Sequence, residues 1–263
     1  MLTRFAPAPT GYLHLGHVVN ALFVWGFAER HGGRVLLRVE DHDRQRCRPE
    51  YEAALFEDLD WLGFVPHIIA PRQSEREDAY RYQVERLVAR GVVYGCDCTR
   101  AQIGGPRYPG TCRDRGIPLS DTVGWRVRFD DRAIYFRDIF LGPQQQLPSA
   151  EFGDILIRDR HANWTYQWAA TTDDFLQRIT HVIRGVDLLD STGRQLQLAG
   201  LLGRTEPLSF GHHPLVMKTA TQKLSKSGRD SGIRDLRAMG WTREKVLEEA
   251  GRLVNMYSLL DNK

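Results

Sequence analysis

Strand and helix patterns alternate along the first part of the chain, and this alternation restricts the fold more than any other feature of the sequence. The first two strand patterns are each followed by a helix pattern, at residues 3–6, 15–30, 34–40 and 49–62. A strand at 179–183 and a helix at about 191–202 resume the alternation. The pattern predicts an α/β fold with a parallel sheet, in which ligands bind at the carboxyl ends of the strands.

A different pattern separates these two parts. Ser74 and Glu77 form a predicted capping box before a helix that stops at Gly91. Three of the four cysteines and three short candidate strands follow, at 125–129, 134–137 and 155–158. We interpret this segment as an insertion. The chain then divides into the first half of the α/β domain, the insertion, the second half, and a loop with a short helical tail, at 1–91, 92–165, 166–216 and 217–263.

The composition argues against a membrane or secreted protein. Of the 263 residues, 42% are hydrophobic and 26% are charged, which is the balance of a globular chain. No apolar stretch approaches the roughly 20 residues that a membrane-spanning helix needs, and no secretory signal precedes Pro7 and Pro9. We therefore expect a cytoplasmic protein without a membrane partner. We also expect a monomer. The net charge of +3 permits an anionic partner but does not require one.

The cysteines indicate a metal site. Cys96, Cys98 and Cys112 lie close together in the sequence and offer three thiolates to one tetrahedral zinc ion, which takes four ligands in structural sites. No histidine lies between Cys98 and Cys112, so the spacing names no fourth ligand. The alternative is a small satellite core of three buried cysteines. Cys47 lies apart from the cluster, and we assign it no role.

Two histidines stand where the first predicted strand, a proline-rich loop and the first helix meet, in the string His14-Leu15-Gly16-His17. Residues three apart share one face of a helix, and a helix start adds free N–H groups and a positive dipole end. Such a cluster can stabilise the charge that builds on a phosphoryl group in its transition state. Gly16 leaves room for a flat base. For the isolated string, two incidental histidines or a metal-binding pair are the alternatives.

A second string, Lys223-Leu224-Ser225-Lys226-Ser227, lies far downstream in a loop that contains glycine and serine. Lysines can clamp a triphosphate, and small hydroxyl residues let a loop close over it. Residues 218–237 hold six cations and two acids, a net charge of 6 − 2 = +4 that suits a phosphate-rich ligand. A solvated surface loop is the alternative for this segment taken alone.

Together the two strings resemble the HIGH and KMSKS signatures of class I aminoacyl-tRNA synthetases. Residues 4–11, Arg-Phe-Ala-Pro-Ala-Pro-Thr-Gly, resemble the R-F-A-P-S-P-T-G segment of glutamyl synthetases. Residues 38–44 and 183–188 are similar to the R-[IV]-E-D-x-D-R and V-R-G-x-D-L stretches of the same enzymes. The resemblance covers nearly all of the chain. It implies a Rossmann-like catalytic domain, a parallel α/β sheet interrupted by a zinc-containing insertion.

The resemblance also implies roles for individual residues. The catalytic residues would be His14, His17 and Lys226. ATP would contact His14, Gly16, His17, Asp187, Lys223 and Lys226. Glutamate would contact Arg4, Ala6, Ala8, Glu40, Tyr166 and Arg184. Within the last set, Arg4, Tyr166 and Arg184 would hold the side-chain carboxylate and Glu40 the α-amino group, because arginine suits bidentate carboxylate binding. Surface salt bridges, a core tyrosine and a strand cap are the alternatives for these four.

One residue departs from the family pattern. Ala8 replaces the usual serine, and the lost hydroxyl is worth roughly 0.5–1.5 kcal/mol if it was hydrogen-bonded. Backbone groups of the same loop remain available to the amino acid.

Two features narrow the resemblance. The given chain ends 36 positions after Ser227, so we expect none of the helical anticodon-binding region that glutamyl synthetases carry there. Residues 108–112, Tyr-Pro-Gly-Thr-Cys, resemble the Y-x-x-x-C element of glutamyl-queuosine tRNA(Asp) synthetases, which implies Tyr108 as the fourth zinc ligand. That family implies ATP-dependent activation of L-glutamate without tRNA, with Mg²⁺ accompanying ATP, and transfer to the queuosine base of tRNA(Asp).

Three alternative functions remain at this stage. A shortened glutamyl-tRNA synthetase would charge the 3′-terminal ribose instead. A non-catalytic zinc- and RNA-binding remnant would keep the fold without the chemistry, although intact His14, His17 and Lys226 argue against it. A nucleotidyltransferase of the same superfamily would share the phosphate motifs alone.

Overall fold

The N-terminal part of the chain forms the predicted parallel α/β unit. In the computed structural model, which describes residues 1–215 and 232–254, the strands β1 (Leu2–Phe5), β2 (Arg34–Leu37) and β3 (Ile68–Ile69) form a parallel sheet in that order. Helix α1 (Leu15–Arg30) connects β1 to β2, and α2 (Pro49–Leu62) connects β2 to β3. Both helices have the predicted bounds. The second strand was predicted to reach residue 40 but ends at Leu37.

A second sheet continues the first. Its order is β7 (Gly142–Gln146), β6 (Ile134–Asp138), β10 (Ser209–His213) and β9 (His181–Gly185), and only the β6–β7 hairpin is antiparallel. Helix α6 (Tyr166–Leu176) precedes β9, and the 3₁₀ segment η2 (Val186–Ser191) with α7 (Thr192–Leu202) connects β9 to β10. Leu2 N donates to Thr180 Oγ1 at 2.8 Å, and Thr180 N donates to Leu2 O at 2.9 Å. These bonds join β1 to the start of β9.

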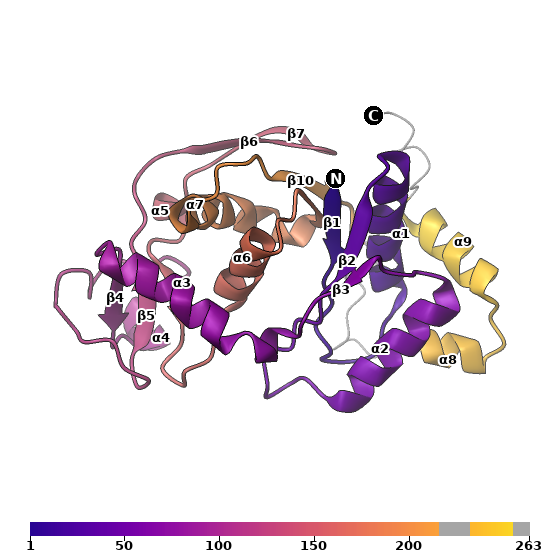
Figure 1. Cartoon of the computed structure of the whole chain (residues 1–263), viewed down its shortest axis with the longest axis horizontal. Coiled ribbons are helices and arrows are strands. Elements are labelled where there is room, and N and C mark those ends of the chain that lie inside the picture. Colours follow the sequence, from indigo (N-terminus) through magenta and orange to yellow (C-terminus); the bar gives the residue numbers. More distant parts are fainter. Residues whose placement is uncertain (216–231, 255–263) are drawn as a thin grey trace.

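The segment predicted as an insertion contributes to both parts of the molecule. A separate antiparallel sheet contains β4 (Val93–Cys96), β5 (Gly124–Val127) and β8 (Ile155–Arg158), with short helices α4 (Arg100–Ile103) and α5 (Pro148–Glu151) in the same segment. Figure 1 shows β4, β5 and α4 at one end of the molecule, next to α3 (Glu77–Ala89). By contrast, β6 and β7 belong to the larger sheet through the pairing of Asp138 with Phe210.

The predicted capping box before α3 is wrong. Ser74 lies in a 3₁₀ turn, η1 (Gln73–Glu75), and Arg76 is the N-cap residue without a side-chain cap. The Ser74 hydroxyl donates instead to Asp41 Oδ2 at 2.5 Å. Glu77 accepts a hydrogen bond from Trp164 Nε1 at 2.5 Å. Ser74 and Glu77, which the local spacing paired with the helix start, therefore bind residues that are distant in the sequence.

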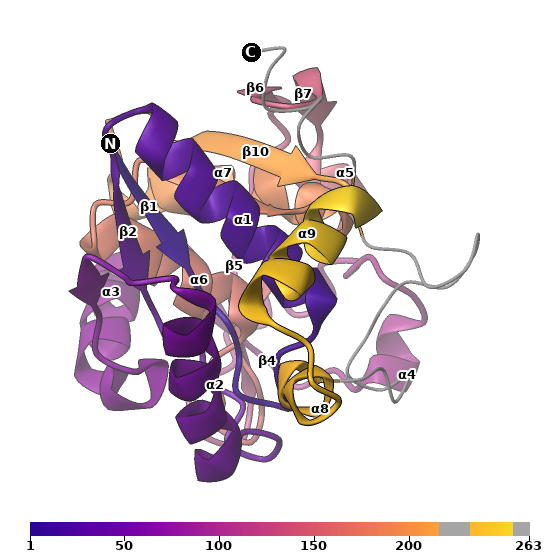
Figure 2. The same cartoon turned by 90° about the vertical axis from the view of Figure 1, so that its right-hand side faces the viewer.

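The largest hydrophobic core lies between α1, the first sheet and the C-terminal helices. Phe5, Val24 and Leu37 are buried there together with Val246 of α9 (Arg243–Leu253). Figure 2 shows α9 alongside α1, with α8 (Ile233–Ala238) near α2. The helical tail is thus confirmed within the described residues, and it holds the helix whose N-terminus carries His14 and His17. No described helix combines the length and apolar character needed to cross a bilayer.

Candidate active site and cysteine cluster

A cavity of about 550 Å³ lies where the chain leaves β1, β2, β9 and β10. This is the carboxyl edge of the parallel strands, where the α/β pattern predicts a ligand. The cavity is lined by the predicted site residues Arg4, Ala6, Ala8, His14, Gly16, His17, Glu40, Tyr166, Arg184 and Asp187. The two predicted lysines, Lys223 and Lys226, lie outside the described residues. Residues from five separate elements therefore meet in one place.

The two histidines cap the start of α1 reciprocally. His14 is the N-cap residue, and its Nδ1 accepts from Gly16 N at 3.1 Å. His17 Nδ1 accepts from His14 N at 3.2 Å, and the two ring centroids are 4.0 Å apart. A nitrogen that accepts a hydrogen bond carries no proton, so each neutral ring carries its proton on Nε2. The capping thus makes Nε2 the donor nitrogen of both rings.

Gly16 has a second reason to be glycine. A Cβ at this position would lie 2.9 Å from His14 Cε1 and 3.0 Å from His14 Nδ1. Any side chain would therefore push the His14 ring out of its capping position. The sequence predicted that Gly16 leaves room for the flat base of a nucleotide. The structure shows that it also leaves room for the His14 ring.

A buried ion-pair network fixes two of the predicted glutamate-binding residues. Arg38 contacts Asp174 Oδ1 at 2.8 Å and Glu40 Oε1 at 3.0 Å, and Arg4 contacts the same oxygen of Asp174 at 3.3 Å. Burial opposes the ionisation of Asp174, but the charges of Arg38 and Arg4 hold its pKa below the usual value. The network therefore holds Arg4 and Glu40 at the cavity wall.

Arg184 differs from Arg4, Arg38 and Arg158, which are buried arginines that form ion pairs. Its guanidinium donates to His212 Nε2, Gln195 Oε1, Leu188 O and Thr192 Oγ1, at 3.0, 2.7, 3.1 and 2.9 Å. Tyr166 also interacts with it, while burial lowers the pKa of Arg184. Among the described residues, no carboxylate forms an ion pair with Arg184. The guanidinium stays protonated at any physiological pH, so it is a buried cation held by neutral groups.

The charge balance around the cavity points to an anionic ligand. The ion-paired network contains three cations and three anions, namely Arg4, Arg38 and Arg76 with Glu40, Asp173 and Asp174. The network is balanced within itself, and none of its carboxylates forms an ion pair with Arg184, although Asp174 attracts the guanidinium from a longer distance. A buried charge without a partner is costly, and a carboxylate bound in the cavity would remove that cost.

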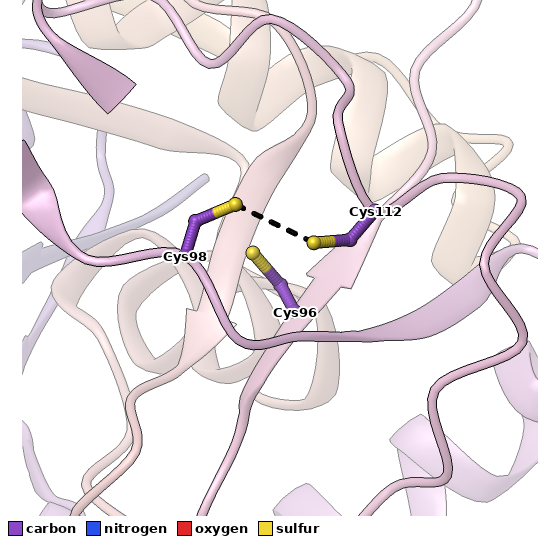
Figure 3. A group of neighbouring side chains, drawn as sticks. All are labelled: Cys96, Cys98 and Cys112. Atoms are coloured by element: carbon purple, nitrogen blue, oxygen red, sulfur yellow. Dashed lines mark hydrogen bonds between the residues drawn. The ribbon is translucent and has the colours of Figure 1, made fainter. Parts of the chain in front are cut away.

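The three clustered cysteines converge as the sequence predicted. Figure 3 shows the thiols of Cys96, Cys98 and Cys112 pointing toward one another. The three sulfur atoms lie within 4.8 Å of one another, and Cys98 Sγ lies 3.4 Å from Cys112 Sγ. Ligands of a tetrahedral zinc ion with bonds of about 2.3 Å lie about 3.8 Å apart. The cluster can therefore hold a metal ion after small adjustments.

Tyr108 lies beside the cysteines. Its hydroxyl is 3.5 Å from Cys96 Sγ and accepts a hydrogen bond from Cys112 N at 2.8 Å. The guanidinium carbon of Arg126 lies 3.7 Å from the centroid of the Tyr108 ring. The same residues also form a small hydrophobic cluster with Ile103 and others, so the satellite-core alternative describes the packing without excluding a metal.

Sequence reasoning missed the residues that support the site. Asp173 and Asp174 are adjacent acids in the otherwise largely apolar helix α6, and this pair was a usable signal for a buried charge network. Asp138 and His212 lie behind Arg184 and carry no comparable motif. Their role becomes visible only when β6, β9 and β10 are paired.

Comparisons with known proteins identify the family of the chain. A family model described as the catalytic domain of class I tRNA synthetases (E and Q) matches residues 1–115 and 120–257. The glutamyl-Q tRNA(Asp) synthetase of Symbiobacterium thermophilum is 40% identical over an alignment 285 residues long. The match covers 98% of this chain and 87% of that protein. The protein of the same name from Thiobacillus denitrificans is 44% identical over 236 residues, which cover 86% of this chain and 77% of that protein.

The fold has counterparts among solved structures. A glutamate tRNA ligase from Elizabethkingia meningosepticum, crystallised in complex with its amino acid, matches with a TM-score of 0.75 and 30% identity. The match covers 92% of this chain and 53% of that chain, so this chain spans about half the length of the ligase. On the strength of the family model and the full-length relatives, the chain belongs to the class I tRNA synthetases of the E and Q type and, within them, to the glutamyl-Q tRNA(Asp) synthetase family.

Proposed function

We propose that this chain activates L-glutamate with ATP and transfers the glutamyl group to the queuosine base at the wobble position of tRNA(Asp). The observation that carries the proposal is the cavity itself, which brings the His14 and His17 pair together with a buried Arg184 that lacks a carboxylate partner among the described residues. The relatives named glutamyl-Q tRNA(Asp) synthetase support the acceptor.

Glutamate would bind by charge. Arg184, Arg4 and Tyr166 would receive the side-chain carboxylate, since the Tyr166 hydroxyl already interacts with the guanidinium of Arg184. Glu40, held by Arg38, would receive the α-ammonium group. Ala6 and Ala8 line the same wall and would contribute backbone groups. Glutamine lacks the negative charge that Arg184 requires, so it should be rejected.

The first reaction would occur at the start of α1. The α-carboxylate oxygen of glutamate forms a bond to the α-phosphorus of ATP, the bond to the bridging oxygen breaks, and pyrophosphate leaves with the electron pair. The Nε2–H groups of His14 and His17, with Lys226, would stabilise the charge of the transition state. Gly16, Asp187 and Lys223 would complete the ATP site. Mg²⁺ bound to ATP would screen the phosphate charges.

We propose a structural zinc ion at Cys96, Cys98, Tyr108 and Cys112. The geometry supports this proposal, because the three sulfur atoms lie within 4.8 Å of one another and the Tyr108 hydroxyl lies 3.5 Å from Cys96 Sγ. Its contribution would be to tie the end of β4 to the loop around Cys112, in a region that has only a small core of its own. The division of the chain at 92–165, a monomeric state and a cytoplasmic location remain predictions.

Glutamate-dependent ATP–pyrophosphate exchange tests the first reaction. We expect exchange with glutamate in the absence of tRNA. Glutamine and aspartate should not support exchange. Absence of exchange under every condition would leave the non-catalytic alternative. Transfer is then measured with tRNA(Asp) that carries or lacks queuosine and with tRNA(Glu). Charging of the 3′-terminal ribose of tRNA(Glu) alone would establish the shortened glutamyl-tRNA synthetase, which the relatives do not favour.

A further inference from the structure

We propose that Asp138 and His212 are positioning residues for glutamate recognition, which hold the Arg184 guanidinium in the orientation that receives the side-chain carboxylate. The inference rests on the proposed function and deepens its glutamate site. The β6–β7 hairpin would then serve to place Asp138, the last residue of β6, beside His212 of β10. Arg184 lies in β9, on the other side of β10. Three neighbouring strands thus contribute one chain of contacts.

Asp138 is a buried carboxylate with both oxygens engaged. Its Oδ1 accepts from the backbone N–H groups of Phe140, Leu141 and His212, at 3.0, 3.0 and 3.2 Å. Its Oδ2 lies 2.5 Å from His212 Nδ1, and neither side chain is exposed. Burial opposes the ionisation of Asp138, but the hydrogen bonds from the His212 ring and from the backbone hold its pKa below the usual value.

These contacts determine the tautomer of His212. An ionised carboxylate only accepts hydrogen bonds, so His212 Nδ1 must carry a proton toward Asp138. Burial and the nearby charge of Arg184 lower the pKa of His212 against the opposing influence of Asp138, so the ring is neutral. Its Nε2 therefore carries no proton and accepts from Arg184 Nε at 3.0 Å. The opposite tautomer would place the Nε2–H group of His212 against the Nε–H group of Arg184.

The other partners of Arg184 complete its positioning. Thr192 Oγ1 accepts from Nη2 at 2.9 Å and lies 3.2 Å from His212 Nε2. Gln195 Oε1 accepts from Nη1, and the amide of Gln195 is oriented because its Nε2 donates to Gln167 Oε1 at 2.9 Å. Each of these acceptors is neutral. The negative charge of Asp138 lies beyond the imidazole ring, so it can favour the cation without occupying the position of a ligand carboxylate.

Three variants separate positioning from general packing. In Asp138→Asn, the backbone amides require an acceptor at Oδ1, so the asparagine NH₂ would face His212 Nδ1 and force the proton onto Nε2, against Arg184 Nε. In His212→Asn, the polar group reaches Asp138 but leaves Arg184 without its acceptor. In His212→Gln, the amide oxygen can reach the Nε2 position and restore the bond to Arg184. The proposal therefore predicts that glutamine rescues and asparagine does not.

Steady-state pyrophosphate exchange provides the readout. We expect Asp138→Asn and His212→Asn to raise the KM for glutamate by about 10- to 100-fold, the usual cost of losing a supporting contact or of a small misplacement. The KM for ATP should stay unchanged, and His212→Gln should remain closest to wild type. Asp58→Asn is the matched control, because Asp58 is also buried and contacts an arginine, Arg237 at 3.2 Å, but does not line the cavity.

The tautomer is measured independently of activity. Imidazole ¹⁵N spectra of the wild type should show His212 protonated at Nδ1 and unprotonated at Nε2, and Asp138→Asn should reverse this. A wild-type ring protonated at Nε2, equal effects of the two His212 variants, or equal increases in the KM values for glutamate and ATP would each overturn the proposal. If the wild type catalyses no glutamate-dependent exchange, the proposed function fails, while the ¹⁵N spectra still decide the chain of contacts. If Asp138→Asn does not fold, the two His212 variants decide.

Discussion

Arg38 Nη1 lies 2.8 Å from Asp174 Oδ1, a contact that spans 136 positions of sequence. Arg38 is fully buried in the stretch that follows β2, and Asp174 lies in α6, the helix that begins with Tyr166. Because Arg38 also contacts Glu40 and Asp174 also contacts Arg4, one ion pair connects two of the proposed glutamate-binding residues to a common support.

Removing the carboxylate of Asp174 should destabilise the fold. Asp174→Ala leaves Arg38 and Arg4 buried beside a lost partner, so we expect the free energy of unfolding to fall by about 3–5 kcal/mol. Urea denaturation at neutral pH measures the change. The control is Asp114→Ala, because Asp114 is largely exposed in its ion pair with Arg128 and should contribute no more than about 1 kcal/mol. Equal losses from the two variants would contradict the buried network.

The Asp174 carboxylate should also make the free energy of unfolding depend on pH in the acidic range. Burial opposes ionisation of Asp174, but Arg38 and Arg4 hold its pKa below the usual value in the folded state. Its contribution is therefore fully present above the unfolded pKa of about 3.9 and is lost as the pH falls through the lower folded pKa. We expect the stability difference between wild type and Asp174→Ala to be constant near neutral pH and to shrink below about pH 4. A difference that grows on acidification would refute this assignment.

The two halves of the active site should separate kinetically. Arg184→Ala should mainly raise the KM for glutamate, because Arg184 would contact a carboxylate that does not react. Lys226→Ala should mainly lower kcat, because Lys226 would contact phosphates whose charge changes in the transition state. Pyrophosphate exchange at varied glutamate and ATP concentrations measures both. Equal effects of the two changes on both parameters would mean that the sites are misassigned.

The close packing of Gly16 should make it sensitive to a single methyl group. In Gly16→Ala, the added Cβ would lie 2.9 Å from His14 Cε1, so the ring must move and kcat should fall. The control is Gly200→Ala in α7, where the nearest atom is Arg132 Nη2 at 3.6 Å and alanine favours the helix by about 1 kcal/mol. Full activity of Gly16→Ala would show that the His14 position does not matter for the first reaction.

The metal site predicts one zinc ion per chain. Cys98→Ser and Cys112→Ser should abolish or strongly weaken binding, and Tyr108→Phe should do less, because the thiolates dominate the affinity. Elemental analysis and chelator titration of the freshly purified protein measure the content. Cys47→Ser is the control, since Cys47 lies outside the cluster. If the wild-type protein contains no zinc, the three cysteines form only a small hydrophobic core.

Local signals predicted much of the fold. Helices at 15–30 and 49–62 have the predicted bounds because the glycines after the first helix, and the starting proline and amphipathic pattern of the second, all act within a few residues. The strand at 155–158 and the meeting of Cys96, Cys98 and Cys112 were likewise predicted. The capping box at Ser74 failed because Asp41, 33 positions away, accepts the hydroxyl.

The sequence by itself determined the alternating strands and helices, the place of the histidine pair at the start of the first helix and the types of residue that surround the cavity. Only the tertiary structure decided that β6 joins the larger sheet, that Arg4, Arg38 and Asp174 share one buried network, and that His212 contacts both Asp138 and Arg184. The reason is physical. Periodicity and caps depend on neighbours along the chain, whereas a buried charge depends on partners that strand pairing brings together from distant positions.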